Sequence, residues 1–416
     1  MDHLPFRRWA LLSLLNFCIL AAVGVLLRYK IIFSLPMVHQ KNLLHGHSHF
    51  AFSGWVGMAL FTGIVWVIYR HHKSLDLQPY KRLFWLGQMA AFGMLCTFPF
   101  MGYKWPSIAL STLSVVFSYL FAWRAWKDMR QSTVPLPVAQ WFRASFVMLG
   151  LSTLGTFFLA WLMMQKGPGQ EWYIGSVYFF LHFQYNGWFL FAILGFFYYF
   201  ISRIPYQAGC HARPQVFRYL VIASIPAYFL SALWMRLPSW MYWSAVASGL
   251  LQLVALYYFS LLLFRCVRGT RAEVSGIVKW LWGFALLAFI LKILMQALSV
   301  IPAVTHLAFG FRPIVIGYLH MVLLGLVSFF LLGFLVQEKL IDRHSKTTNA
   351  GFILFISAVV LNEILLMLQG VRSIWMQAFP YANQLLFGVA IMIFTGLLLI
   401  IIGQRTGTGA VDRGAA

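Results

Sequence analysis

Charged residues are scarce in this sequence. They make up 10% of its 416 residues, whereas hydrophobic residues make up 61%. This composition excludes an ordinary soluble protein and indicates a polytopic helical membrane protein. The ten-residue alternation of apolar and polar residues that marks a membrane β-barrel is also missing.

Cysteine and acidic residues are rare as well. The four cysteines form no C-x-x-C pair, so the sequence indicates neither a disulfide framework nor a zinc site. Acidic residues number only nine. A transporter is expected to have paired carboxylates in its apolar spans, whereas here Glu363 stands alone.

Apolar stretches of about 20 residues, long enough to cross a bilayer as a helix, recur along the chain. We count twelve, at about 9–28, 44–69, 83–103, 106–123, 141–165, 173–202, 215–235, 239–264, 276–299, 311–337, 350–371 and 382–403. We therefore expect an all-α integral membrane protein. Its twelve transmembrane helices would form one domain over residues 1–405, followed by a flexible cytoplasmic tail at 406–416.

The excess of 31 basic over nine acidic residues is a topology signal, not a nucleic-acid surface. Basic residues gather at the termini and in the connections after even-numbered spans. By the positive-inside rule, both termini are then cytoplasmic. We expect a multi-pass protein of the cytoplasmic (inner) membrane, with membrane lipid and no nucleic acid as a partner.

A histidine frame recurs on three spans. His49, His182 and His320 are each followed by glycine five residues later, in HFAFSG, HFQYNG and HMVLLG. Each lies in the second span of a set of four, so the frame indicates an internal repeat. The three pseudo-repeats cover about 1–135, 136–272 and 273–405. Ionisable residues in apolar spans are costly and therefore functional candidates.

These histidines suit a haem. From the polar start of each span they lie eight to eleven residues in, which is roughly 12–16 Å below the outer boundary. Two facing helices with histidines at one depth are what a low-spin, bis-histidine haem b requires. We take His49 and His320 as the ligand pair. His45, on the same helix face as His49, and His47, on the opposite face, compete with His49; hydrogen bonding between helices is the structural alternative.

In architecture, nearly the whole chain resembles the catalytic subunit (subunit I) of the haem–copper oxidase and nitric oxide reductase superfamily. YLHMVLLG, at 318–325, resembles that family's tenth helix, and HFQYNGW, at 182–188, resembles its sixth, where a histidine binds the second metal. The resemblance implies haem ligands on helices 2 and 10, with a second haem or copper left open. It also implies that Tyr318 stands at the high-spin haem ligand position and that Arg372 contacts haem propionates.

The function implied by this resemblance is electron transfer or handling of NO or O₂, with an electron-donor subunit or cytochrome as partner. The departures limit it. The seventh span lacks the family's histidine pair, and Asn186 stands where the oxidases have tyrosine and the reductases glutamate. We expect no complete dinuclear centre and assign no catalytic residue. His182 is either part of a rebuilt metal or high-spin haem site, or a structural residue bonded to Tyr318, Asn186 or water.

Two other interpretations stay open. GHSHFAFSG resembles the H-x-H-E-M-x-F-G motif of NnrS-type haem- and copper-containing proteins of the nitric oxide response, with Phe50 in place of glutamate. The second interpretation is a non-redox transporter or accessory subunit whose histidines hold a transported metal. Lys292, Glu363 and Asn362 lie in apolar spans, where a structural role and a proton path are equally open.

Overall fold

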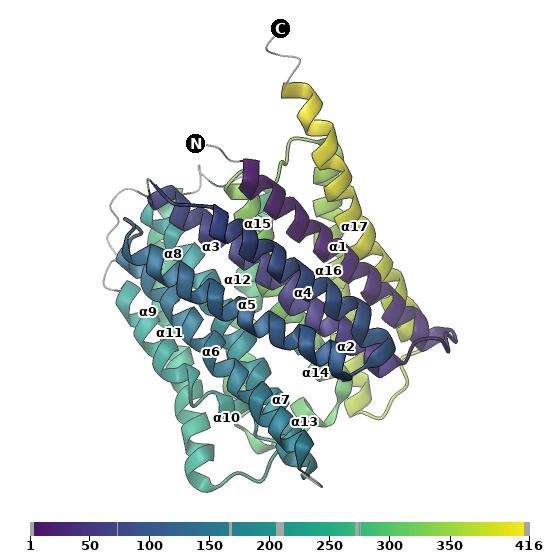
Figure 1. The fold of residues 1–416 in the computed structure, drawn as a ribbon. Helices are drawn as coiled ribbons and strands as arrows, with labels where there is room; N and C mark the ends of the chain where they lie inside the picture. The colour runs from purple at the N-terminus through teal and green to yellow at the C-terminus, as the bar shows by residue number, and fades with distance from the viewer. Residues whose placement is uncertain are drawn as a thin grey trace. The chain divides into compact units, whose positions relative to one another are not determined.

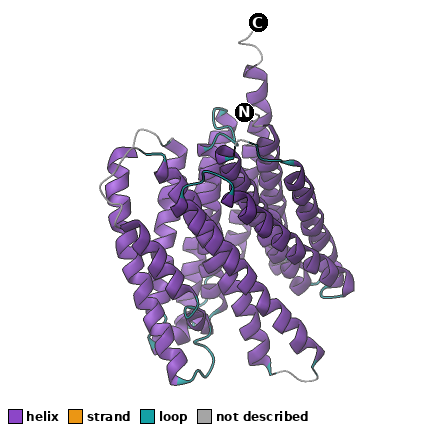
Figure 2. Ribbon diagram, turned by 60° about the vertical axis from the view of Figure 1, so that its left-hand side comes forward, coloured by secondary structure: helices purple, strands orange, loops and turns teal. Residues whose placement is uncertain are grey.

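The protein is built from helices. The computed structural model describes residues 4–72, 74–165, 169–204, 212–270, 274 and 276–411. Every regular element within these ranges is a helix, as Figure 2 shows. Eleven of the described helices are long and apolar enough to cross a membrane. The chain is therefore an all-helical, multi-pass membrane protein, as its composition predicts.

The chain divides into two compact units. The first consists of Met1–Ser132, Gly276–Trp282 and Ser328–Ala416. Its helices are α1 (Leu4–Ile32), α2 (Gln40–Phe50), η1 (Ala51–Gly57), α3 (Met58–His71), α4 (Gln78–Met101), α5 (Trp105–Arg130), α15 (Phe329–Gln337), α16 (Lys346–Ile374) and α17 (Ala382–Val411). In Figure 1, α17 runs beside α1, at the two ends of the colour scale, and Tyr29 packs against Phe387 there.

The second unit consists of Thr133–Ser275 and Gly283–Val327. Its helices are α6 (Leu136–Met164), α7 (Gln170–Leu181), η2 (His182–Phe189), α8 (Leu190–Ser202), α9 (Ala212–Ser224), α10 (Tyr228–Ser231), α11 (Ser239–Thr270), the larger part of α12 (Gly276–Leu298), α13 (Pro302–Gly310), α14 (Arg312–His320) and all but the last residue of η3 (Met321–Ser328).

The seventh expected span differs from the prediction. Instead of one helix over 215–235, the chain forms α9, a turn at 225–227, and the four-residue α10. Pro226 has no N–H to continue the helix and clashes with the preceding turn. The spanning helices among the described residues therefore number eleven rather than twelve.

The second span of each set is the most buried. In the spans Gln40–His71, Gln170–Ser202 and Arg312–Gln337, between 72% and 89% of the most apolar stretch is buried, against at most 50% in the other eight. Large aromatic side chains such as Trp55 and Trp66 are fully enclosed. The recurring histidines thus lie on the most buried of the spanning helices.

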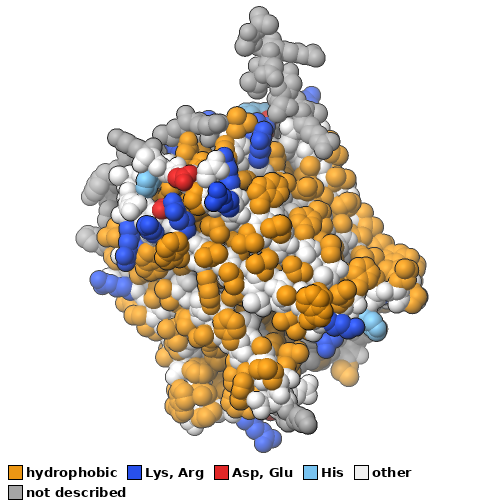
Figure 3. Space-filling view, viewed as in Figure 1, with side chains coloured by type: hydrophobic (Ala, Val, Ile, Leu, Met, Phe, Trp, Pro, Cys, Tyr) orange, Lys and Arg blue, Asp and Glu red, His pale blue; other side chains and the backbone are white. Residues whose placement is uncertain are grey.

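The surface of the protein is largely apolar, and its last helix is long. On the face drawn in Figure 3, apolar side chains predominate, and Lys and Arg gather near the end of α3 and the start of α4, where Arg70 and Arg82 are exposed. The apolar face suits contact with lipid tails. Helix α17 continues to Val411, into the segment that we expected to be a flexible tail, and residues 412–416 lie outside the described residues.

Candidate functional site

Each of the three histidine frames coincides with a π-helix. The segment η1 begins two residues after His49, η2 begins at His182, and η3 begins directly after His320. In a π turn the N–H group bonds the carbonyl five residues back instead of four, so the turn holds one extra residue. Such turns are rare, occur mostly as single insertions within α-helices, and are frequent at functional sites. The sequence repeat therefore marks a repeated backbone device.

The extra residue of η1 is visible in the spacing of its contacts with α1. Phe17 and Gly24 lie seven residues apart, on one face of α1. The Phe17 ring stacks on Trp55 at 4.3 Å between centroids, and a Cβ at Gly24 would lie 3.5 Å from His47 Cε1. His47 and Trp55 are eight residues apart. They share a face because the π turn between them adds a residue.

The other two histidines of this segment face α4. His49 stacks on Phe98 with centroids 4.4 Å apart and an interplanar angle of 8°, and its Nε2 lies 3.3 Å from the Tyr103 hydroxyl. His45 packs edge-on against Tyr103 at 4.9 Å. The Nε2 atom of His45 is buried with no hydrogen-bond partner among the described residues. The division of the three histidines between two faces follows the helical spacing.

A buried amide holds the first π turn. Asn16 of α1 is 1% exposed, and its Nδ2 donates to the Gly54 carbonyl at 2.7 Å and to Gln88 Oε1 at 2.9 Å. The Gly54 carbonyl lies inside η1, where the α-helical hydrogen-bond ladder is altered, so a donor from a neighbouring helix stabilises it. Our reading of the sequence passed over Asn16 and Gln88. Their only signal was polarity within apolar spans.

The second span and the last part of the tenth, from Ser328 on, lie side by side in the first unit. Trp55 Nε1 donates to Ser328 Oγ at 2.8 Å, and Trp66 Nε1 donates to Glu338 Oε2 at 3.0 Å. From the first contact to the second, the residue number rises by 11 on the helix with the tryptophans and by 10 on the other helix. The two helices are therefore parallel neighbours. Both tryptophans and Glu338 are buried.

In the second unit, His182 has both ring nitrogens engaged. Its Nε2 lies 2.9 Å from the Ser224 carbonyl, which only accepts, so Nε2 carries the proton. Asn186 Nδ2 donates to the other nitrogen, Nδ1, at 3.2 Å. The ring is 1% exposed. This bonding leaves no lone pair of His182 for a metal ion.

The Ser224 carbonyl is available because the seventh span is broken. In a continuous helix it would accept the N–H of Tyr228, but that N–H bonds the carbonyl of Ile225 instead. The break at Pro226 thus creates the acceptor that His182 uses. The seventh span thus contributes a backbone oxygen as the hydrogen-bond acceptor of His182.

His320 is bonded differently. Its Nδ1 lies 2.8 Å from the Ile316 carbonyl on its own helix, so Nδ1 carries the proton and Nε2 is the basic nitrogen. A histidine that donates from one nitrogen to a backbone carbonyl and ligates through the other is the usual arrangement at metal sites. Nearby, the Tyr318 ring lies 6.4 Å from that of Tyr185. The Tyr318 hydroxyl is buried without a partner among the described residues.

The remaining candidate residues have local partners. Arg372 donates from Nη1 to the Ala378 carbonyl at 2.9 Å, which caps the turn after α16. Lys292 is 1% exposed and donates to Gln296 Oε1 at 2.8 Å. Glu363 accepts from Asn362 at 3.0 Å. Each of these hydrogen bonds lies within one helix or its terminal turn.

The described side chains contain no group of three or more His, Cys, Asp or Glu residues that could hold a metal ion. A bis-histidine haem needs only two protein ligands, one on each side, so this finding bears on multi-ligand metal sites. Comparison with known proteins gives no match to any family model or to any curated protein.

Proposed function

We propose that the protein is a haem-b-binding membrane protein, related to the haem–copper oxidases and nitric oxide reductases, that acts in electron transfer or in handling NO or O₂. Its iron would be held by His320 and one of the three histidines between His45 and His49. We further propose the cytoplasmic (inner) membrane as its location, with both termini cytoplasmic, because the exposed basic residues follow even-numbered spans.

The observation that carries this proposal is the hydrogen bond between Trp55 and Ser328. His320 precedes Ser328 by eight residues with a π turn between them, so the two share one face of their helix, as an i and i+7 pair does in an α-helix. His47 precedes Trp55 by the same eight residues through η1. We propose that His47 and His320 are the two ligands of the haem.

This register favours His47 as the second ligand over His49, our first choice from the sequence. His49 stacks on Phe98 and has Tyr103 beside its Nε2, on the opposite face of the helix. The protonation of His320 at Nδ1 supports its role, because it presents Nε2 as the basic nitrogen. Haem supplies a one-electron carrier or a gas-binding iron when bound.

We do not propose a second metal at His182, because both of its ring nitrogens are hydrogen-bonded. Copper or non-haem iron normally takes three or four protein ligands, and the broken seventh span supplies none. The role left to these residues is to position helices. The proposal is therefore limited to one haem, and the electron donor would be a separate subunit or cytochrome.

The test is an absorption spectrum of the purified full-length protein, oxidised and dithionite-reduced. We expect the bands of a low-spin b-type haem. His320→Ala and His47→Ala should lose them, while His49→Ala and the exposed-loop control His344→Ala should keep them. A colourless protein after expression with haem supplied would contradict the proposal. Loss in His49→Ala but not His47→Ala would show that the face assignment is wrong.

One observation favours the transporter alternative. The seventh span is discontinuous, and broken helices bearing free backbone carbonyls form substrate sites in many transporters. Here the carbonyl of Ser224 is already bonded to His182, and the described residues contain no group of three or more His, Cys, Asp or Glu that could hold a metal ion. Transport of a metal ion by a colourless preparation would favour this alternative.

A further inference from the structure

A cavity of about 600 Å³ lies in the second unit, and two of its lining residues, Trp234 and Phe309, pack against Tyr178 of α7. Its walls come from the α10–α11 connection, the first turns of α11, the α12–α13 connection and α13. Both connections follow odd-numbered spans, so they lie at the same end of the helices. The volume falls in the range of about 300–1,000 Å³ that is typical of small-molecule sites.

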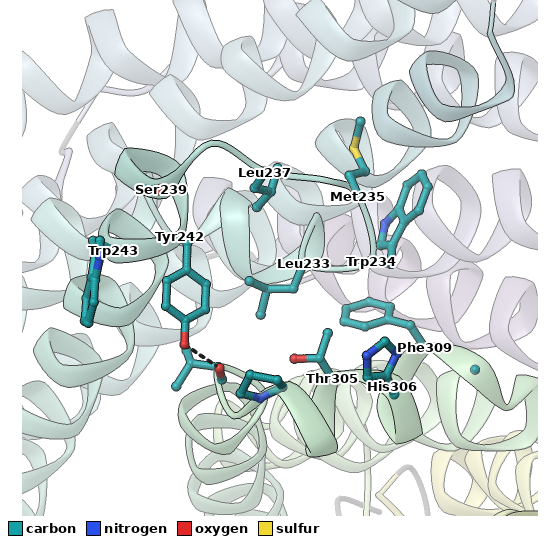
Figure 4. Close-up of a pocket in the computed structure, with 13 residues that line it drawn as sticks. Leu233, Trp234, Met235, Leu237, Ser239, Tyr242, Trp243, Thr305, His306 and Phe309 are labelled. Carbon is teal, nitrogen blue, oxygen red and sulfur yellow. Dashed lines mark hydrogen bonds between the residues drawn. The ribbon is translucent and has the colours of Figure 1, made fainter.

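Two short helices contribute to the cavity or stand beside it. Helix α10 has four residues and α13 has nine. Hydrogen bonds fix the walls that remain. Tyr242 donates its hydroxyl to the Val300 carbonyl at 3.1 Å, and Trp234 Nε1 donates to Ser231 at 3.1 Å. The bond between Tyr242 and Val300 is the dashed line in Figure 4.

The lining selects a neutral ligand with a flat ring. None of the lining residues is Asp, Glu, Lys or Arg, so a charged group entering the cavity would lose its hydration without gaining a counter-ion. Four aromatic side chains, those of Trp234, Tyr242, Trp243 and Phe309, contribute to the walls. Aromatic faces stack favourably on flat rings.

One polar side chain is placed to orient such a ligand. His306 lies beside Phe309 and Thr305 at the rim (Figure 4). Its ring makes no hydrogen bond to any described residue, while the Thr305 hydroxyl is already bonded to the Ser299 carbonyl at 2.5 Å. A neutral imidazole offers one donor and one acceptor, which suits a hydroxyl or carbonyl oxygen.

We propose that this cavity binds a neutral, lipid-soluble ring compound that carries a hydroxyl or carbonyl oxygen, with His306 as its hydrogen-bond partner. Trp243, on the wall of the cavity, is 64% exposed, and exposed apolar side chains of this chain are suited to contact with lipid. This site is independent of the proposed haem. Interfacial tryptophans also form unspecific aromatic belts, so the test has to separate a site from a belt.

The probe is 1,4-naphthoquinone, with naphthalene as the analogue that lacks oxygen. Binding to the full-length protein in lipid nanodiscs is measured by equilibrium dialysis, with empty nanodiscs subtracted. We expect one saturable site that prefers the quinone. His306→Phe keeps a ring but removes the hydrogen bond, and should weaken binding about three- to tenfold. Trp243→Leu should weaken it as well, whereas Trp172→Leu, an equally exposed tryptophan outside the cavity, should not.

A substitution that fills the cavity provides a second test. A Cβ at Gly310, which lines the cavity, meets nothing within 4 Å, and the same holds at Gly283, which does not line it. Gly310→Leu should therefore abolish binding and Gly283→Leu should leave it unchanged, both with unaltered melting temperature. Binding no greater than to empty nanodiscs would overturn the proposal. So would equal affinity for naphthalene, or equal losses in Trp243→Leu and Trp172→Leu.

Discussion

His182 and His320 stand at the start of the same backbone device but use their rings in opposite ways. Each begins or directly precedes a π turn that ends near the motif glycine. His182 spends both nitrogens on partners from its surroundings, the Ser224 carbonyl and the Asn186 amide. His320 bonds through Nδ1 to a carbonyl of its own helix. The repeated frame fixes where an imidazole lies, and its hydrogen bonds decide what it can do.

The difference originates in the neighbouring helix. His182 finds an acceptor because Pro226 breaks α9 and leaves the Ser224 carbonyl outside the helical ladder. His320 instead bonds a carbonyl one turn back on its own helix, that of Ile316. One proline in one span is thus enough to turn a candidate ligand into a structural residue.

The largest expected effect is on folding, at His182. His182→Ala leaves the Ser224 carbonyl and the Asn186 amide buried without their partner and opens a cavity. We expect a loss of about 2–4 kcal/mol in the free energy of unfolding. Denaturant unfolding of the haem-free protein in detergent measures it. The exposed His344→Ala should change stability by less than about 0.5 kcal/mol.

His320→Ala completes this comparison. It removes a ring that is only partly buried, whereas the His182 ring is 1% exposed and bonded at both nitrogens, so the haem-free protein should lose clearly less stability than His182→Ala does. The haem spectrum should be lost in His320→Ala and kept in His182→Ala. If both variants lose equal stability, or if His182→Ala alone removes the spectrum, the contrast between the two rings is wrong.

Much of the fold follows from the sequence. Long apolar stretches predict helices that span a membrane, because unsatisfied backbone groups are too costly in lipid. The H-x4-G frame located all three π turns without revealing them, since the five-residue interval is that of an i→i+5 hydrogen bond. The opposite faces of His47 and His49 follow from spacing alone. The hydrophobicity of residues 215–235 predicts one helix there. Pro226 breaks that helix in the structure.

What the sequence does not show are the contacts between distant segments. The bond between Trp55 and Ser328 joins residues 273 apart in the chain, and the bond between Asn16 and Gln88 joins residues 72 apart. No local pattern predicts such pairs. The acceptor of His182, 42 residues away, exists only once α9 has broken. The choice among His45, His47 and His49 depends on these contacts, and the sequence therefore left it open.

The motif glycines give the next largest effect. A Cβ at Gly187 would lie 2.6 Å from Met148 Cβ, whereas at Gly325 the nearest atom, Ala288 Cβ, is 3.4 Å away. Gly187→Ala forces α6 and η2 apart and should cost about 1–3 kcal/mol. Gly325→Ala meets ordinary contact and should be tolerated within about 0.5 kcal/mol. Thermal melting of both variants measures this, and equal losses would mean that the glycines serve the π turn itself.

The amide that holds the first π turn is expected to have a smaller effect. Asn16→Leu removes both donors of Asn16 and leaves the buried Gly54 carbonyl and Gln88 Oε1 without them. Hydrogen bonds between membrane helices contribute modestly, so we expect a loss of about 1–2 kcal/mol. Gln88→Leu should lose less, because the bond from Asn16 to Gly54 remains. A loss in Gln88→Leu that equals or exceeds that of Asn16→Leu would contradict the role given to the carbonyl.

The smallest effect, and the only one of opposite sign, is expected at Tyr318. Its hydroxyl is buried without a hydrogen-bond partner among the described residues, whereas His182 is fully bonded. Removing an unsatisfied polar atom spares its desolvation cost, so Tyr318→Phe should leave the haem-free protein unchanged or stabilise it by up to about 1 kcal/mol. The same substitution should destabilise the protein only if a bound group uses the hydroxyl. Unfolding measured with and without haem separates these cases: a loss confined to the haem-loaded protein would assign Tyr318 to the haem site, and a loss in both would show that the hydroxyl has a partner within the fold.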